Sequence, residues 1–351
     1  MTRPLGIGLV GAGRFGEFCV AAFADLPGVR IVAVTDAARD RAETVAALAD
    51  GQATVHEDLE GLLDDPAVDI VHVGTPPYLH GPVARRAAER GKHVFVEKPL
   101  ATSLAEGVGA VAAARLAGVQ LSIDYVLRHH PLHRLAIALS RSGALGRLQL
   151  FALENFASCE ALPPDHWFWD RARSGGIHVE HGVHFFDLCV ALAGRLPDVV
   201  CGSTQRRPDG AADRMSALLG FGDELVASFH HAFNRAAATE RTTIRLAFER
   251  GHATIEGWIP TRLAVEGEVS ASEVTQLRKL FGAELVTIET RRGTVAVSGT
   301  AEAPDRQGEY RDAIRAGMSD LVAAIRGERP LAVTAEDGIR SLEIALRATG
   351  A

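Results

Sequence analysis

Short apolar runs alternate with amphipathic stretches over residues 5–100. Runs rich in β-branched residues at 7–10 and 30–36 indicate buried parallel strands. Between them, apolar residues recur at helical spacing from Phe15 to Leu26. Further strands are expected at 53–56, 69–74, 93–97 and 119–124, and further helices at 39–49, 57–63, 80–90 and 103–117. This alternation predicts a doubly wound parallel α/β sheet, a Rossmann domain spanning residues 1–124.

After residue 125 the pattern changes to strands that follow one another directly. Strands are expected at 199–207, 215–221, 224–232, 241–249 and 252–257, with weaker ones at 262–266 and 285–288. Helices are expected at 131–142, 181–193, 309–326 and 335–348. Because short turns join consecutive strands, the sheet should be mainly antiparallel. Residues 125–351 are therefore predicted to form an α+β domain for substrate binding and oligomerisation.

Composition adds little beyond a soluble globular class. Apolar residues make up 47% and charged residues 23% of the 351 positions, and the net charge of -7 gives no reason to expect a nucleic acid or membrane partner. The four cysteines form no CxxC pair, which favours a reducing compartment. The N-terminal apolar run is far shorter than the roughly 18 residues of a membrane span and lacks a signal-peptide layout. A cytoplasmic protein is expected.

The sequence "GAGRFG" places Gly11, Gly13 and Gly16 in G-x-G-x-x-G spacing. The motif follows an expected strand and opens an expected helix, which is the context of a dinucleotide-binding turn. Gly11 would permit the tight turn, Gly13 would let the backbone approach a pyrophosphate, and Gly16 would let the helix pack closely. An ordinary strand–helix turn is the alternative interpretation.

Asp36 ends the second strand, twenty residues after Gly16. A carboxylate there accepts hydrogen bonds from the adenosine ribose and repels a 2′-phosphate, so NAD is the predicted cofactor. Arg39 leaves NADP open, because a nearby arginine can receive that phosphate.

Residues 74–101, "GTPPYLHGPVARRAAERGKHVFVEKPLA", resemble the segment that marks the Gfo/Idh/MocA family of oxidoreductases. The resemblance continues through "DYVLRHHP" (124–131), "SGGIHVEHGVHFFDL" (174–188) and the C-terminal "RPLAVTAEDGIRSLEIALRA". It implies NAD(P)-dependent hydride transfer to or from a secondary carbinol of a sugar, sugar derivative or cyclitol. It also implies a cis bond before Pro99 and Lys98 beside the nicotinamide. The expected cofactor-binding residues are Gly11, Gly13, Arg14, Phe15, Gly16, Asp36, Thr75, Pro76, His80, Glu97 and Lys98.

The family pattern D-x-G-x-H-x-x-D falls on Glu180, His184 and Asp187, with Glu180 in place of the first Asp. Helical spacing would put these three side chains on one face. Alcohol oxidation needs a proton acceptor, and histidine ionises near neutral pH. We therefore expect His184 as general base, Lys98 as the cation that stabilises the alkoxide, and Glu180 as orienter or substrate ligand.

Several other residues are candidates for substrate contact. Tyr125 and Arg128 follow the last Rossmann strand, and the aromatic Trp167 and Trp169 could stack on a sugar ring or simply pack. The predicted substrate-binding residues are Tyr125, Arg128, Trp167, Trp169, His178, Glu180 and His184. Metal binding by "HVEHGVH" is not expected, since the spacing matches neither H-E-x-x-H nor H-x-x-E-H. A helix end with solvated histidines is the remaining alternative.

The large sheet of the second domain should leave one face uncovered by helices. Leu218, Val226 and Phe229 are candidates for burial there, which predicts a homodimer or homotetramer. His230 and His231 should point to opposite sides of their strand. Two other functions remain open: a redox-neutral sugar-modifying enzyme that retains NAD, and a non-catalytic nucleotide-binding regulator.

Overall fold

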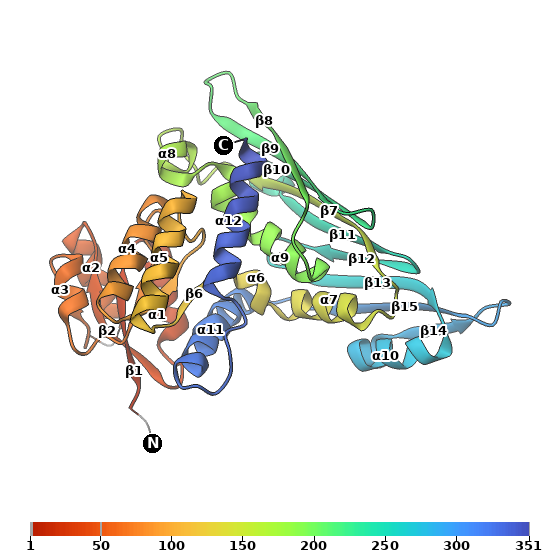
Figure 1. Cartoon of the computed structure of the whole chain (residues 1–351), viewed down its shortest axis with the longest axis horizontal. Coiled ribbons are helices and arrows are strands. Elements are labelled where there is room, and N and C mark those ends of the chain that lie inside the picture. Colours follow the sequence, from red (N-terminus) through yellow and green to blue (C-terminus); the bar gives the residue numbers. More distant parts are fainter. Residues whose placement is uncertain (1–2, 50, 351) are drawn as a thin grey trace. The chain divides into compact units, whose positions relative to one another are not determined.

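The computed structural model describes residues 3–49 and 51–350, which form two compact units (Figure 1). The first unit runs up to Val126 and also takes in Asp170–Gly175 and Arg311–Glu343. The second consists of Leu127–Trp169, Gly176–Tyr310 and the chain from Ile344 onward. The chain thus returns twice to the first unit, whereas the sequence interpretation makes a single division at residue 124.

The first unit is built on a six-stranded parallel sheet in the order β3-β2-β1-β4-β5-β6. Its strands are β1 (Leu5–Val10), β2 (Val29–Thr35), β3 (Thr54–Val55), β4 (Ile70–Val73), β5 (His93–Val96) and β6 (Leu121–Ile123). The inner strands β1, β4 and β5 are buried except at the first residue of β1 and of β5, because helices cover both faces, as their continuous apolar runs predict. The predicted fold class is confirmed.

Right-handed crossovers assign the helices to the two faces of this sheet. The helices are α1 (Arg14–Phe23), α2 (Arg39–Leu48), α3 (Leu59–Asp64), α4 (His80–Glu89), α5 (Leu104–Ala117) and α11 (Arg306–Ile325). Ion pairs from Arg86 and Arg90 to Glu60 join α3 and α4. On the other face, Arg315 of α11 donates to the Ala22 carbonyl of α1 at 2.6 Å. The strand order reverses between β1 and β4, so their carboxyl ends flank the crevice where such sheets bind ligands.

The second unit contains a nine-stranded sheet in the order β14-β15-β13-β12-β11-β7-β10-β9-β8. Its strands are β7 (Leu148–Ser158), β8 (Val199–Arg206), β9 (Ala212–Phe221), β10 (Leu225–Arg235), β11 (Arg241–Phe248), β12 (Gly251–Glu256), β13 (Arg262–Val269), β14 (Val286–Glu289) and β15 (Val295–Glu302). All pairings are antiparallel except β7 with β10. The sequence interpretation assigned no strand to β7 or β15.

Helices cover one face of this sheet (Figure 1). They are α7 (Pro131–Ser142), α9 (Val183–Ala193) and α10 (Ala271–Phe281), and α10 was also unassigned from sequence. Phe229 lies on this covered side, where it packs on Phe151 and Phe186, so its predicted place on the open face is wrong. Leu218 and Val226 do lie on the open face, each 45% exposed. His230 and His231 point to opposite sides, as expected: His230 bonds Ser216, and His231 is fully buried.

α12 (Ala335–Thr349) ends the described chain, with residues up to 343 in the first unit and the rest in the second. Among the described residues, no helix combines the length and apolarity that a membrane crossing requires.

Candidate active site

The turn after β1 has the geometry that its glycines predict. Gly11 has φ +104°, and a Cβ there would lie 2.6 Å from the Gly74 carbonyl oxygen. A Cβ on Gly16 would lie 2.5 Å from the Gly11 carbonyl oxygen. Both distances are far below van der Waals contact, so these two positions require glycine for the fold itself.

Gly13 differs from its two neighbours in the motif. Its φ is −77°, which any residue adopts, and a Cβ there would meet nothing within 4 Å. The fold therefore has no need of glycine at this position, and the open space lies directly at the N-cap of α1. Free N–H groups and the helix dipole attract phosphate at such an end. The turn accordingly fits the pyrophosphate of a dinucleotide, with Arg14 and Phe15 as the first helical residues.

Asp36 links the end of β2 to this turn. Its Oδ2 accepts a hydrogen bond from the Ala12 N–H at 2.7 Å, and its Oδ1 accepts from the Ala38 N–H and from Arg41. Burial opposes ionisation, but these donors together lower the pKa of Asp36 below its usual value. Arg39, which the sequence interpretation connected with NADP, instead pairs with Glu43 and Glu57.

The loop after β4 and the turn after β5 are joined through one buried histidine. His80 Nδ1 lies 2.7 Å from the Pro99 carbonyl oxygen, and Nε2 lies 2.6 Å from the Thr75 carbonyl oxygen. Burial lowers the pKa of His80 to about 4, so the neutral ring donates to one carbonyl at a time. The Thr75 Oγ1 is buried with no partner in the described chain, which leaves it for a bound ligand. The Lys98–Pro99 bond is cis, as the resemblance implies.

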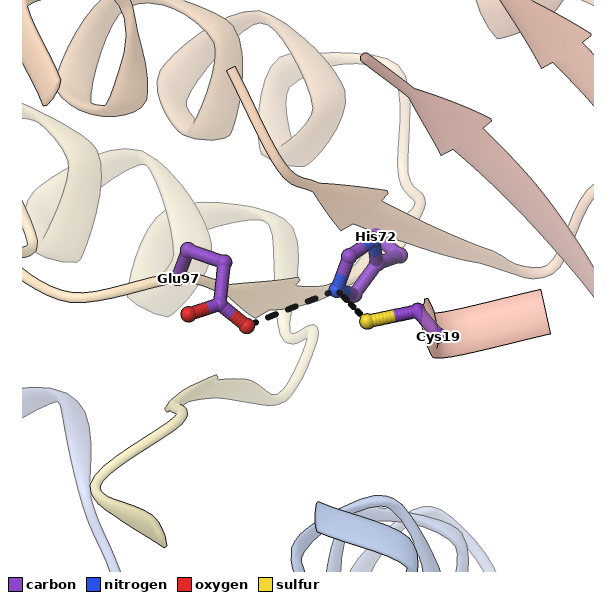
Figure 2. Close-up of side chains that lie close together, drawn as sticks. All are labelled: Cys19, His72 and Glu97. Atoms are coloured by element: carbon purple, nitrogen blue, oxygen red, sulfur yellow. Dashed lines mark hydrogen bonds and ion pairs between the residues drawn. The ribbon is translucent and has the colours of Figure 1, made fainter. Parts of the chain in front are cut away.

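Lys98 is the second residue after β5, and its neighbour Glu97 lies in a buried polar group. Glu97 Oε1 lies 3.7 Å from His72 Nε2, which in turn lies 3.6 Å from Cys19 Sγ (Figure 2). Asp124 follows β6, and burial together with the nearby Glu97 carboxyl raises the pKa of Asp124 well above its usual value. Burial raises the pKa of Glu97 to about 7, and the Lys98 ammonium counters that rise.

The second unit carries the histidine-rich stretch. Residues His178–Gly182 form one turn of π-helix, and α9 begins only at Val183. The predicted spacing of Glu180, His184 and Asp187 along one regular α-helical face therefore does not hold, because the first lies in the wider π turn. Such π turns are frequent at functional sites.

His184 packs against the ring of Trp258, with the ring centroids 4.9 Å apart. His181 packs against the same indole at 4.8 Å. Trp258 lies in the turn between β12 and β13, so a residue distant in sequence fixes both imidazoles. His184 itself is nearly buried, at 3% exposed. The residues around His184 within this unit are apolar and aromatic. In such surroundings of low dielectric constant, a hydrogen bond from one polar group would orient the imidazole strongly.

Beneath the π turn, two further histidines are buried. His178 lies among Phe186 and His231, and burial lowers its pKa to about 4. His231 is fully buried beside His181 and Phe185, and burial holds its pKa well below the usual value. Both rings are therefore neutral at pH 7. Together with the aromatic rings around them, they form a packed layer that supports the π turn.

Arg128 and Asp187 form an ion pair in the second unit, with Arg128 Nη1 at 3.0 Å from Asp187 Oδ1. The Asp187 side chain is only 3% exposed. Because Arg128 is predicted to contact substrate, this pairing gives Asp187 the role of fixing the guanidinium.

The aromatic residues that were predicted to contact substrate already make some contacts within the chain. The Trp169 indole N–H donates to the Leu162 and Pro163 carbonyls, and Arg207 lies 4.3 Å over its ring. Trp167 is half-buried beside His166. Tyr125 is fully buried in the first unit. Substrate contact by these residues stays a prediction.

Five residues in these groups were not identified from sequence: Cys19, Arg41, His72, Asp124 and Trp258. Arg41 could have been found, because it lies five residues after Asp36, one turn into the following helix. Asp124 and Trp258 act through partners that are remote in sequence, and no local pattern marks them.

Comparison with known families agrees with this geometry. Residues 5–125 match the GFO_IDH_MocA model, described as an oxidoreductase family with an NAD-binding Rossmann fold. Residues 133–254 match the GFO/IDH/MocA C-terminal domain. The chain belongs to the GFO/IDH/MocA family of oxidoreductases, whose N-terminal domain binds NAD.

Individual relatives show the range of the family. The chain is 30% identical to the uncharacterized oxidoreductase YrbE of Bacillus subtilis over 197 residues, 55% of each chain. It is 26% identical to scyllo-inositol 2-dehydrogenase (NAD(+)) of the same organism, covering 99% of this chain and 94% of that protein. A levoglucosan dehydrogenase solved with NADH and levoglucosan has a TM-score of 0.82 at 20% identity, covering 99% and 98% of the two chains. At that identity the match concerns the fold.

Proposed function

We propose that this protein is an NAD-dependent dehydrogenase that interconverts a secondary alcohol and a ketone on a sugar, sugar derivative or cyclitol. One observation carries the proposal: the open turn at Gly13 and the ammonium-bearing Lys98 lie at the carboxyl ends of strands of the same parallel sheet. Ligands of such sheets bind at that edge. The name of one relative that covers nearly the whole chain, scyllo-inositol 2-dehydrogenase, supports the substrate class.

When bound, NAD supplies the hydride acceptor. We assign His184 as the base that takes the alcohol proton and Lys98 as the cation that stabilises the developing alkoxide. The Trp258 indole holds the imidazole of His184, which favours a single ring orientation. Glu180 is assigned to a neighbouring substrate hydroxyl or to orienting His184, and Arg128, fixed by Asp187, to another hydroxyl.

NAD is proposed over NADP because of Asp36. Its carboxylate is ionised by the donors around it, and a second anion such as a 2′-phosphate would be repelled. We also propose a cytoplasmic location, since all four cysteines are free thiols.

The proposal is tested by screening NAD reduction over inositols, aldoses and anhydrosugars, with the corresponding keto sugars assayed in reverse. With a turned-over substrate, Lys98→Met should lower kcat by about a hundredfold or more, the range seen when one electrostatic donor is lost. NADH binding, measured by fluorescence titration, should change only a few fold. Lys279→Met is the matched control, because Lys279 lies exposed on α10.

His184→Asn should remove the rise of rate with pH near neutrality, where imidazole bases ordinarily ionise. His230→Asn is its control, since His230 bonds Ser216 on the open face of the sheet. Undiminished turnover in Lys98→Met or His184→Asn would reject the assignment. Failure of every polyol and keto sugar would reject the substrate class.

A further inference from the structure

A thiol, an imidazole and a carboxyl group converge inside the first unit (Figure 2). Cys19 comes from α1, His72 from β4, and Glu97 is the residue after β5. Cys19 and His72 are fully buried, and Glu97 is 9% exposed. One ligand atom from each of the three side chains lies within 4.8 Å of the other two. The proposed dehydrogenase reaction uses neither Cys19 nor His72.

The distances between these atoms match the spacing of ligands around a metal ion. His72 Nε2 lies 3.6 Å from Cys19 Sγ and 3.7 Å from Glu97 Oε1, so both interactions in Figure 2 end on the same nitrogen. Metal bonds of about 2.0–2.3 Å in a tetrahedral arrangement put neighbouring ligand atoms about 3.3–3.8 Å apart. A hydrogen bond between nitrogen and oxygen is shorter, about 2.7–3.2 Å. Small shifts of the three side chains would therefore let one ion reach all three atoms.

Hydrogen bonding within the chain leaves part of this group unsatisfied. His72 Nε2 can accept the S–H of Cys19, but it then has no proton to donate to Glu97 Oε1. In the part of the chain that the structure describes, Glu97 Oε1 is buried without a hydrogen-bond partner. Burial lowers the pKa of His72 to about 4, so the ring is neutral at pH 7 and forms no ion pair with that oxygen. A buried oxygen without a partner is costly, and a cation between these atoms would satisfy it.

The donor set and its surroundings select among metals. Sulfur, nitrogen and oxygen ligands together suit zinc, whereas magnesium and calcium prefer oxygen alone. Phe23 and Phe95 pack on the His72 ring, with centroids 5.7 Å and 5.9 Å away, and so hold the imidazole in place. Zinc commonly takes three protein ligands and completes its four with water. The ion would account for His72 Nε2, while His72 Nδ1 is buried without a partner among the described residues.

We propose that Cys19, His72 and Glu97 form a zinc site that ties α1 and β4 to the chain after β5. Binding replaces the S–H bond of Cys19 with a zinc–sulfur bond, and the proton passes to solvent. Burial raises the pKa of Cys19 well above its usual value, so the thiol keeps its proton until the metal displaces it. The proposal does not depend on the proposed dehydrogenase activity, because each readout concerns the metal or the fold.

The metal content of the whole protein is the first test. Natural protein produced in zinc-supplemented cells and then desalted should carry about one equivalent of zinc by mass spectrometry of the metal. Cys19→Ala and His72→Asn should each retain about tenfold less, because a site of three protein ligands loses one of them. Less than about a tenth of an equivalent in the natural protein would overturn the proposal, and so would equal zinc in Cys19→Ala. One equivalent of another transition metal in its place would overturn the assignment to zinc.

Cys189→Ala is the matched control, because Cys189 is also a fully buried free cysteine but lies on α9 in the second unit. It should keep the zinc content of the natural protein. Cys201→Ala removes an exposed thiol and so tests binding at the surface. Zinc lost in Cys201→Ala but kept in Cys19→Ala would place the metal at the surface and overturn the buried site.

Cobalt reports on the sulfur ligand directly. Natural protein produced with Co²⁺ in place of zinc should show thiolate-to-cobalt charge-transfer absorption in the near ultraviolet. Cys19→Ser should lose that absorption, and Cys189→Ala should keep it. Bound cobalt without the absorption would exclude Cys19 as a ligand, and the spectrum of the natural protein gives this result even if the Cys19 variants do not fold.

Zinc should also stabilise the protein, because the three ligands are brought together only in the folded chain. We expect the zinc-loaded natural protein to have a Tm about 5 °C or more above that of protein prepared without zinc. Cys19→Ala should show no such difference, whereas Cys189→Ala should show all of it. Equal Tm values for the natural protein with and without zinc would mean that no ion ties these elements together, and would overturn the proposal.

Discussion

Asp36 supports the fold through its hydrogen bonds and lies where the cofactor is proposed to bind. Its two oxygens already accept bonds from Ala12, Ala38 and Arg41. An ionised carboxylate has about four acceptor sites, and Arg41 fills two of them with its Nε and Nη2 groups, so a ribose hydroxyl would have to replace a bond from this exposed arginine. The bond to Ala12 also ties the end of β2 to the glycine turn, so the carboxylate is fixed before any cofactor arrives.

We expect Asp36→Asn to lower the ratio of NAD to NADP efficiency by about tenfold or more, because a charged hydrogen bond is worth about 1.5–3 kcal/mol. The measurement is kcat/KM for both cofactors with one substrate. Arg39→Ala is the control, since Arg39 pairs with Glu43 and Glu57. A natural protein that prefers NADP, or an unchanged ratio in Asp36→Asn, would contradict the role given to Asp36.

At the scale of the element, the glycines of the β1–α1 turn are present for two different reasons. Gly16 serves the fold, because a Cβ there would collide with the Gly11 carbonyl. The fold does not require glycine at position 13, because the position has room for a side chain and a suitable φ, and we propose that the space receives the ligand. Alanine substitutions at these two glycines should therefore affect different properties, stability at Gly16 and NADH binding at Gly13.

Gly13→Ala should leave thermal stability nearly unchanged and weaken NADH binding about tenfold or more, as the methyl group occupies the space of a phosphate contact. Gly16→Ala should cost about 1–3 kcal/mol of stability, the usual cost of overpacking. Calorimetry and fluorescence titration of NADH on both variants separate the effects. Unchanged NADH affinity in Gly13→Ala would show that the turn does not hold the dinucleotide.

At the scale of the whole molecule, the open face of the nine-stranded sheet is the feature that no element of the described chain explains. Val226 lies beside Leu150 in register, and Leu218 lies beside Cys201. Leu150, Val199, Leu218 and Val226 are 37%, 57%, 45% and 45% exposed. Apolar residues grouped on adjacent strands are usually covered by another subunit, and we propose a homodimer through this face.

Leu218→Arg should weaken that dimer more than about a hundredfold, because an unpaired buried charge costs about 3–5 kcal/mol. Sedimentation velocity over a range of concentrations measures the change. Leu116→Arg is the control, since Leu116 is 93% exposed on α5 in the other unit. A monomeric natural protein, or a Leu218→Arg variant that associates normally, would exclude this interface.

Local patterns predicted the Rossmann half of the chain more fully than the second half. Strands such as β4 and β5 are buried on both faces and read as apolar runs between helices. β7 was not assigned, although it is a central strand, because polar residues such as Glu154 and Asn155 interrupt its alternation. Asn155 is buried by bonding Thr242 of β11, a partner 87 positions away.

The candidate site divides in the same way. The glycine turn, Asp36 and Lys98 follow strand ends, so their place was predictable from the chain order of the strands. Sequence spacing also suggested a regular helix face for Glu180 and His184, but the chain forms a π turn over His178–Gly182. His178 and His181 of this turn pack on His231, which lies on strand β10.

By itself, the sequence determined the fold class, the family and the glycine turn after β1, because each depends on local conformation or a short motif. The residues assigned to proton transfer stay a prediction. Only the tertiary structure decided which partners these residues have: Arg41 on Asp36, His72 beside Glu97 and Trp258 on His184. Proton affinity and side-chain orientation depend on burial and on neighbours from other elements, and those exist only once the chain has folded.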